Sequence, residues 1–340
     1  MPDRLLALPV RIEASEIVPL ERVVADGVRR SNLVRLCGRG EEGRGEDVTF
    51  DAADRRALLD AGLPEGLYAA RTVGDVTALL RDCKLTAARP RWEAVHRYRF
   101  WAIEAAALDL ALRQGGIGIA EALGRIPAPL HFVVSRRVDG QEDFLELLRR
   151  FPGLSLKLDV TSGWTEGVAA AIAASGTVAT LDLKGTSPGS SVYLEPDPVI
   201  YERVARLFPD VWLEDPGLTP ATERVLAAHR ARIAWDEPVG SVDDVPVGAG
   251  AVNVKPARIG SIQGVLSLLE HCARCEIPVY GGGQSEIGPG RGQAQILASL
   301  FYPTSPNDLA PPGYNDAGPG TGLPSSPFGP VAGVTGFRWR

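Results

Sequence analysis

From about residue 129 onward, the chain alternates short apolar runs with amphipathic helical segments. A repeated strand–helix pattern implies parallel strands that are joined by helical crossovers. Seven or so such units in roughly 180 residues favour a closed barrel over an open sheet. None of the apolar runs is followed by a glycine-rich nucleotide-binding motif, so a doubly wound sheet is the weaker alternative.

Charged residues end five successive apolar runs, in the order base, acid, acid, acid, base: Lys157, Asp182, Glu214, Asp236 and Lys255. The carboxyl ends of parallel barrel strands lie on one face, where barrel enzymes place their catalytic groups. We therefore expect these side chains to converge at one mouth. A single acidic strand end is usually part of an ordinary salt bridge, but five charged ends in succession indicate a functional site.

Lysine is rare in this chain, because only four of its 36 basic residues are lysines: Lys84, Lys157, Lys184 and Lys255. Arginine stays charged, whereas the pKa of a lysine can be lowered until the side chain acts as a base. Two of the four lysines end strands of the predicted barrel, and a third, Lys184, lies beside the strand end at Asp182. This placement favours a chemical role for these lysines.

Three carboxylates in one mouth would raise each other's pKa unless a cation lay between them. Oxygen ligands suit Mg²⁺, with Mn²⁺ as an alternative. A lysine on each side would face a substrate held by that ion and could accept its proton, while the ion stabilises the enolate that develops. These parts fit removal of a proton next to a carboxylate.

The same strand ends resemble motifs of the enolase superfamily. The likeness is greatest to its muconate lactonizing enzyme subgroup, which includes muconate cycloisomerases, o-succinylbenzoate synthases and dipeptide epimerases. It covers about residues 30 to 310, and the ordered set of motifs is more specific than any one of them. The matching stretches are Gly43-Arg44-Gly45-Glu46, Leu156-Lys157-Leu158, Leu181-Asp182, Leu213-Glu214-Asp215-Pro216, Asp236-Glu237-Pro238, Asn253 to Gly260, and Gly281 to Glu286.

The resemblance implies an α/β fold, a modified (β/α)7β TIM-type barrel with an N-terminal α+β capping domain. It implies that the Mg²⁺ ligands are Asp182, Glu214 and Asp236. It also implies that Lys157 and Lys255 are the acid and base on opposite faces of the substrate. Further residues that could contact the substrate or support the site are Lys184, Glu237, Ser285 and Glu286.

Two positions depart from the family's pattern. The K-x-K of the second barrel strand is Ser155-Leu156-Lys157 here, and the D-x-N of the third is Asp182-Leu183-Lys184. Lys184 projects on the same side as Asp182, so it could add positive charge near the metal or bind a substrate carboxylate. The structural alternative is an ion pair with Asp159 or Glu214.

Residues 1–125 lack a regular strand–helix alternation, and we expect them to form the capping domain, completed by the segment 311–340. Residues 126–310 are then the catalytic barrel. Within the first part, residues 32–36 predict a short strand, and Gly43 to Glu46 predict a turn. Residues 100–112 predict a helix with a broad apolar face.

A net charge of −6 gives no basic field, so we do not expect nucleic acid as a partner. No apolar stretch approaches the roughly 20 residues of a membrane span, and the N-terminus lacks a signal-peptide pattern. Four cysteines without zinc-ribbon spacing indicate free thiols and a cytoplasmic protein. The expected partner is a small-molecule carboxylate, and a homo-oligomer is considered by analogy alone.

These residues begin a reaction without fixing its product, because racemisation or epimerisation, cycloisomerisation and β-elimination share one enolate. The expected enzyme is therefore a metal-dependent isomerase, or a lyase that eliminates as an o-succinylbenzoate synthase does. Two other classes stay open: a barrel that uses a lysine as a Schiff-base nucleophile, and a barrel that binds a ligand without catalysis.

Overall fold

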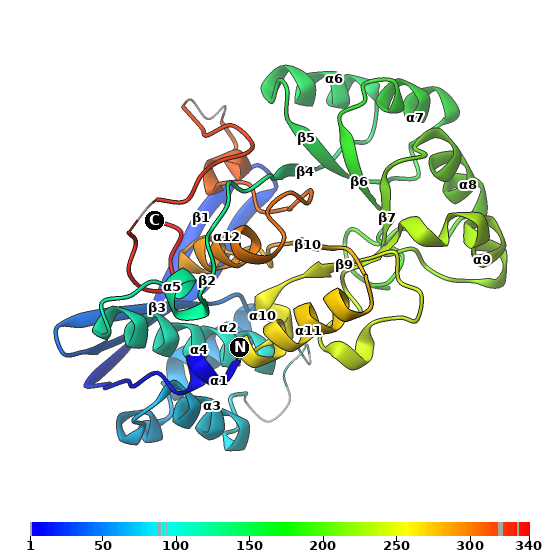
Figure 1. Ribbon diagram of the computed structural model, residues 1–340. Coiled ribbons are helices and arrows are strands. Elements are labelled where there is room, and N and C mark those ends of the chain that lie inside the picture. The colour runs from blue at the N-terminus through cyan, green and yellow to red at the C-terminus, as the bar shows by residue number, and fades with distance from the viewer. Residues whose placement is uncertain (1, 87–89, 91, 93, 319–321, 332) are drawn as a thin grey trace.

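The computed structural model describes residues 2–86, 90, 92, 94–318, 322–331 and 333–340. A three-stranded antiparallel sheet near the N-terminus and a seven-stranded parallel sheet organise these residues. In Figure 1 the blue and cyan N-terminal elements lie at the lower left, and the green strands of the parallel sheet lie at the upper right.

The N-terminal part combines a long hairpin, a third strand and several helices. Its strands are β1 (Ala14–Val24), β2 (Gly27–Gly38) and β3 (Glu41–Asp47). Its helices are α1 (Pro2–Leu6), α2 (Ala52–Ala61), the 3-10 helix η1 (Glu65–Ala69), α3 (Val73–Asp82), α4 (Val95–Gln114) and α5 (Ile119–Leu123). Helix α4 includes the predicted helix at residues 100–112 and is buried along most of its length.

The turn predicted at Gly43 to Glu46 is wrong, because these residues lie within strand β3. A Cβ atom on Gly43 would lie 2.1 Å from the carbonyl oxygen of Ala106, and one on Gly45 would lie 1.9 Å from that of Ala102. Strand β3 therefore approaches the backbone of α4 so closely that only glycine fits. The two glycines serve helix–strand packing and not a change of chain direction.

The parallel sheet has the strand order β10-β9-β8-β7-β6-β5-β4, so each strand pairs with its neighbour in sequence. Its strands are β4 (Val133–Arg137), β5 (Ser155–Asp159), β6 (Val178–Asp182), β7 (Trp212–Glu214), β8 (Ile233–Trp235), β9 (Ala251–Val254) and β10 (Val279–Gly281). The connecting helices are α6 (Gln141–Arg150), α7 (Glu166–Ala173), α8 (Pro198–Leu207), α9 (Pro220–Leu226), α10 (Pro256–Ile259), α11 (Ile262–Arg274) and α12 (Pro289–Phe301). Three 3-10 helices complete the regular structure: η2 (Ala227–Arg232), η3 (Val242–Asp244) and η4 (Pro312–Asn315).

Residues 307–308 occupy the eighth strand position of the barrel. Asn307 forms a parallel bridge with Phe132, and Asp308 forms one with Gly282, so this short segment joins the two edges of the sheet. The arrangement confirms the predicted (β/α)7β barrel with an N-terminal α+β cap.

The C-terminal segment returns to the N-terminal part. The carboxylate of Asp109, in α4, accepts hydrogen bonds from the backbone N–H of Phe337 at 2.8 Å and from Arg338 Nη2 at 2.7 Å. Phe337 is fully buried and packs edge-to-face on Trp101. The domain boundaries at residues 125 and 310 stay a prediction.

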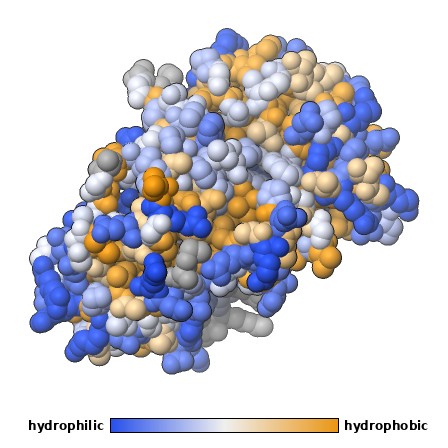
Figure 2. Space-filling view, in the orientation of Figure 1, coloured by the Kyte–Doolittle hydropathy of each residue, from blue (hydrophilic) through white to orange (hydrophobic). Residues whose placement is uncertain are grey.

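Hydrophilic residues cover much of the outer edges of both parts on the face shown in Figure 2. Within the described ranges, no helix combines the length and the apolarity needed to cross a membrane. Cys272 is buried and Cys275 is exposed, and both are free thiols.

Candidate active site

Three carboxylates meet at the carboxyl ends of neighbouring barrel strands. Asp182 ends β6, Glu214 ends β7, and Asp236 follows β8. Each offers an oxygen that lies within 4.8 Å of the others, and all three side chains are buried. The structure thus brings together the three residues that the sequence analysis selected as metal ligands.

Two basic side chains contact the carboxylate of Asp236. Lys255 Nζ donates to Oδ2 at 2.5 Å, and Arg258 Nη1 donates to Oδ1 at 2.5 Å. Burial alone would raise the pKa of Asp236, but Arg258 and Lys255 lower it below its usual range. Arg258 also donates to Gln284 at 3.0 Å, so the first helical turn after β9 is tied to the loop that follows β10.

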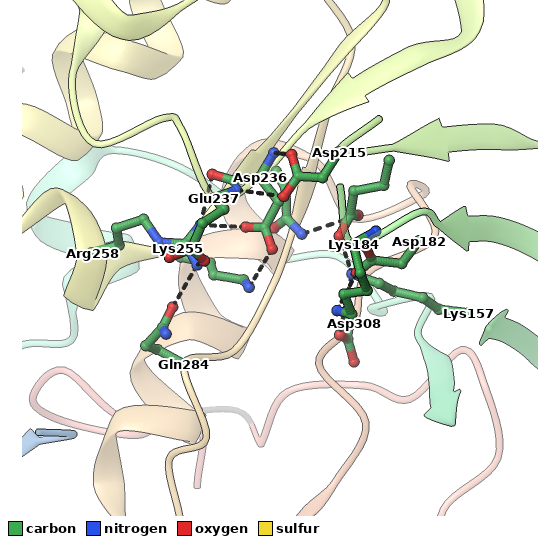
Figure 3. Close-up of polar contacts among 12 residues, drawn as sticks. Lys157, Asp182, Lys184, Asp215, Asp236, Glu237, Lys255, Arg258, Gln284 and Asp308 are labelled. Atoms are coloured by element: carbon green, nitrogen blue, oxygen red, sulfur yellow. Dashed lines mark hydrogen bonds and ion pairs between the residues drawn. The ribbon is translucent and has the colours of Figure 1, made fainter. Parts of the chain in front are cut away.

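Two further lysines contact the triad from the side opposite Lys255, as Figure 3 shows. Lys157 Nζ lies 3.2 Å from Asp182 and donates to Glu214. Lys184 Nζ donates to Asp182 at 2.5 Å. Burial would lower the pKa of Lys157, but the surrounding carboxylates, led by Glu214 and Asp182, raise it.

Glu214 is the most crowded of the three carboxylates. It accepts hydrogen bonds from Lys157, from the phenol of Tyr280 and, at 3.4 Å, from Asn253. Burial raises its pKa well above the usual range; Lys157 opposes this shift, and Asp182 and Asp236 add to it. The free energy of ionising Glu214 therefore depends on how the neighbouring negative charge is compensated.

Asp215 connects the ends of β7 and β8 behind the triad. Its two oxygens accept the backbone N–H groups of Asp236 and Glu237, both at 2.8 Å. Asp215 adopts a left-handed backbone conformation with φ of 48°, which a non-glycine residue rarely does. Burial and the proximity of Asp236 raise its pKa to about 7.

The donor set fits a divalent cation. Three buried carboxylates that lie within 4.8 Å of one another form a hard oxygen site of the kind that Mg²⁺ and Mn²⁺ prefer. Burial and like charge raise the pKa of Glu214, and a cation between the carboxylates would relieve this repulsion.

A cavity of about 400 Å³ opens above these residues, between the barrel mouth and the turn from β1 to β2. Among the residues that the structure describes, its charged lining is mostly basic, and its acidic members are Asp26, Asp159 and Asp308. The basic members are Arg29, Arg136, Arg137, Lys157, Lys184, Lys255 and Arg291.

The remaining predicted residues occupy different places. Ser285 lines the cavity. Glu237 is half-exposed and pairs with Arg258 Nη2 at 2.7 Å. Glu286 is buried, accepts the backbone N–H of Gln284 at 2.9 Å and lies 3.6 Å from Arg291.

Several residues of the site received no role from the sequence. Asp308 lies 3.8 Å from Lys157 Nζ, and the buried Arg291 lines the cavity from the first turn of α12. Tyr280 donates to Glu214 from β10. Asp308 follows the barrel helices in a segment rich in proline and glycine, and only barrel closure places it beside β5.

Comparisons with known proteins support this architecture. An o-succinylbenzoate synthase of Listeria innocua serovar 6a is 37% identical over 86 residues, which are 24% of this chain and 23% of that protein. An N-succinylamino acid racemase of Thermus thermophilus is 28% identical over 337 residues, covering 90% of this chain and 84% of that protein. The chain thus matches only about a quarter of the length of the o-succinylbenzoate synthase.

A solved enolase-superfamily structure from Enterococcus faecalis V583 superposes with a TM-score of 0.68 at 21% identity, covering 89% of this chain and 86% of that one. The chain thus has the fold of solved enolase-superfamily proteins, in agreement with the resemblance seen in the motifs. By its sequence, the chain belongs to the family described as domain of unknown function DUF8230. The N-terminal model of this family matches residues 3–122, and its C-terminal model matches residues 126–316.

Proposed function

We propose that the protein removes a proton next to the carboxylate of a small substrate in a Mg²⁺-dependent reaction. The enolate would then be reprotonated or would close a ring, giving racemisation, epimerisation or cycloisomerisation. The observation that carries this proposal is the set of three buried carboxylates, within 4.8 Å of one another, with lysines on both sides.

The cation would be held by Asp182, Glu214 and Asp236, where its charge would stabilise the negative charge that develops on the substrate carboxylate. Lys255 would serve one face of the substrate. One of two lysines would serve the other face: Lys157, which the sequence favours, or Lys184 beside it. Arg258 and Asp215 would keep Asp236 in place through their contacts with its side chain and its backbone N–H.

The cavity supports an anionic substrate of modest size. Its basic side chains outnumber its acidic ones, so the lining attracts negative charge. A volume of about 400 Å³ suits a small molecule. The racemase relative is named for N-succinylamino acids, which makes N-acylated amino acids a reasonable class with which to begin.

Elimination of a β-substituent is the second candidate, because a curated relative is an o-succinylbenzoate synthase. Elimination begins with the same proton abstraction, and loss of a leaving group from the product distinguishes it. A Schiff-base mechanism would instead leave a covalent adduct on a lysine after borohydride reduction with a carbonyl substrate.

Exchange of the substrate α-proton in D₂O, followed by NMR, tests the proposal. The substrates are N-acyl amino acids, dipeptides, hydroxy acids and lactones, each with Mg²⁺ or with excess EDTA. We expect exchange with at least one class, its loss in EDTA, and its loss in Glu214→Gln. Exchange that continues unchanged in EDTA, or an adduct trapped by borohydride, would contradict the proposed mechanism.

A further inference from the structure

Two lysines lie on the side of the carboxylates that is opposite Lys255, and only one of them needs to reach the reacting carbon. We propose that Lys184 is the catalytic residue on that face and that Lys157 is a positioning residue beneath the carboxylates. The inference rests on the proposed function and assigns its second proton-transfer group.

The two lysines start from different depths in the barrel. Asp159 on β5 pairs with Asp182 on β6, and Asp182 pairs with Glu214 on β7, so these three carboxylates mark one level. Lys157 lies two residues before this level, and Lys184 lies two residues after it, toward the mouth. Each strand residue advances the chain by about 3.3 Å, so the backbone of Lys157 lies two such steps deeper in the barrel than the backbone of the carboxylates. A substrate that enters through the mouth therefore meets Lys184 first.

Lys157 is enclosed by acidic groups. Its side chain is 3% exposed, and its Nζ contacts Glu214 and lies 3.2 Å from Asp182 and 3.8 Å from Asp308. Two of these partners are the proposed metal ligands. The contacts of Lys157 therefore suit a group that orients the carboxylates from below.

Lys184 is the most accessible of the three lysines of the site, with 26% of its side chain exposed against 10% for Lys255. Its Nζ lies 2.5 Å from Asp182 and 3.3 Å from Asp159. All three lysines line the cavity, so they differ in how far each side chain is exposed to it. Asp159 thus holds the ammonium group near the carboxylate level while one side of it faces the cavity.

The backbone supports a special role for position 184. Lys184 has φ of 50°, in the left-handed region that a lysine rarely adopts. The conformation is fixed by a hydrogen bond from its own N–H to Asp182 Oδ1 at 3.1 Å and by the N–H of Leu194, which donates to its carbonyl at 3.2 Å. Strain of this kind persists where the surrounding structure fixes it, often at functional sites.

The proposed step moves one proton between carbon and nitrogen on each face. On one face the α C–H bond breaks, its proton forms an N–H bond with the lysine, and its electron pair moves into the carboxylate as an enolate. On the opposite face the other lysine breaks an N–H bond and gives its proton to the same carbon. Net proton number is unchanged, and no oxidant or further reactant is needed.

Enantiomer-resolved exchange tests the assignment. The D and L forms of N-acetyl- and N-succinyl-amino acids are incubated in D₂O with the Mg²⁺-loaded enzyme. We expect Lys184→Gln to lower exchange of one enantiomer by at least about 100-fold and to spare the other, Lys255→Gln to show the reverse, and Lys157→Gln to slow both alike. Lys184→Asn serves as a second variant, because asparagine tolerates a positive φ, and Lys84→Gln is the exposed control.

The assignment would be overturned if Lys184→Gln exchanged both enantiomers at the wild-type rate, or if it lost the exchange of both equally. Either result would leave the proposed function intact. Failure of the wild-type enzyme to exchange any of these compounds would instead overturn the proposed function, and this inference with it.

A second readout needs no substrate. The chain has only four lysines, so acetylation by limiting acetic anhydride can be followed at each one by mass spectrometry. We expect Lys84 to react fastest and Lys184 to react at least about 5-fold faster than Lys157, as their exposure dictates. Equal or faster labelling of Lys157 would overturn the difference in depth.

Discussion

Arg258 holds several residues of the site together, although the sequence analysis gave it no role of its own. Its buried guanidinium donates to the side chain and the carbonyl of Asp236, to Glu237 and to Gln284. Asp236 is itself buried, so its charge depends on partners inside the protein. Arg258 therefore stabilises both the fold and the predicted metal ligand.

Replacement of Arg258 by methionine should destabilise the protein by about 3 kcal/mol or more, because the buried carboxylate of Asp236 loses one of its two basic partners and keeps only Lys255. We expect the melting temperature in EDTA to fall by at least about 5 °C. Glu237→Gln removes the half-exposed partner of the same arginine and should cost at most about 1 kcal/mol. Equal losses in the two variants would contradict this account of Arg258.

The site residues at the ends of barrel strands could be predicted from the sequence, because apolar runs show where strands end. Asp182, Glu214 and Asp236 were selected in this way, and the structure brings them together. It assigned no role to Asp308, since the neighbours of this residue come from barrel closure and not from a local pattern. The acid/base roles of Lys157 and Lys255 stay predictions.

Strand β3 was predicted wrongly from the sequence, and helix α4 was predicted correctly. Gly-Arg-Gly is typical of a turn, yet Gly43 and Gly45 lie in a strand against the backbone of α4. The requirement for glycine comes from another part of the chain, so local propensity could not show it. Helix α4 was predictable, because its run of alanine and leucine favours a helix locally.

Gly45→Ala should therefore cost about 3 kcal/mol or more. The added Cβ would lie 1.9 Å from the carbonyl oxygen of Ala102, so two backbone segments would have to separate. Gly167→Ala is the matched control, because that glycine lies in α7 with open space around its Cβ position. We expect the control to be neutral or stabilising by up to about 1 kcal/mol, as measured by thermal melting. Equal melting temperatures for the two variants would contradict the close packing.

Helix α4 also carries a buried carboxyl group that should make stability depend on pH. Glu104 is fully buried and accepts hydrogen bonds from Thr77 and from the backbone N–H of Ile262, both at 2.6 Å. Burial raises its pKa from 4.5 to about 7. The hydroxyl of Thr77 has one proton but two acceptors, Glu104 and the carbonyl of Val73, so a proton on Glu104 satisfies both contacts.

The sign follows from proton binding. Between pH 4.5 and about 7 the folded state holds a proton on Glu104 that the unfolded chain has released. The contribution of Glu104 to stability is therefore most favourable below pH 4.5 and falls as the pH rises through about 7. The difference amounts to about 3 kcal/mol. Glu104→Gln mimics the protonated acid, so its melting temperature relative to wild type should rise from pH 5 to pH 8. A difference that stays constant over this range would contradict the buried, protonated Glu104.

At the scale of the whole molecule, the cavity depends on contact between the cap and the barrel. Glu46 of β3 accepts the backbone N–H groups of Ile287, Gly288 and Gly290, at 2.8, 2.9 and 3.0 Å, where α12 begins. Asp26 and Arg29, from the β1–β2 hairpin, line the same cavity as the barrel lysines. The cap therefore supplies part of the wall that a substrate would contact.

The barrel was predictable as a whole, because strand–helix alternation permits few arrangements of parallel strands. The long β1–β2 hairpin of the cap was not, since only residues 32–36 read as a strand, whereas β2 extends over Gly27–Gly38. Many residues that pair between β1 and β2 are exposed and charged, so they show no apolar strand pattern in the sequence. Contacts of β2 with α4 support the hairpin from elsewhere in the chain.

The central claim is that the three strand-end carboxylates form a divalent-cation site. Titration with Mn²⁺, followed by electron paramagnetic resonance, tests it most directly, with Glu214→Gln as the site variant and the exposed Glu270→Gln as the control. We predict one Mn²⁺ per chain in the wild type and the control, displaced by Mg²⁺, and at least about 10-fold weaker binding in Glu214→Gln. Absence of a bound Mn²⁺ in the wild type, or equal affinity in Glu214→Gln, would contradict the account.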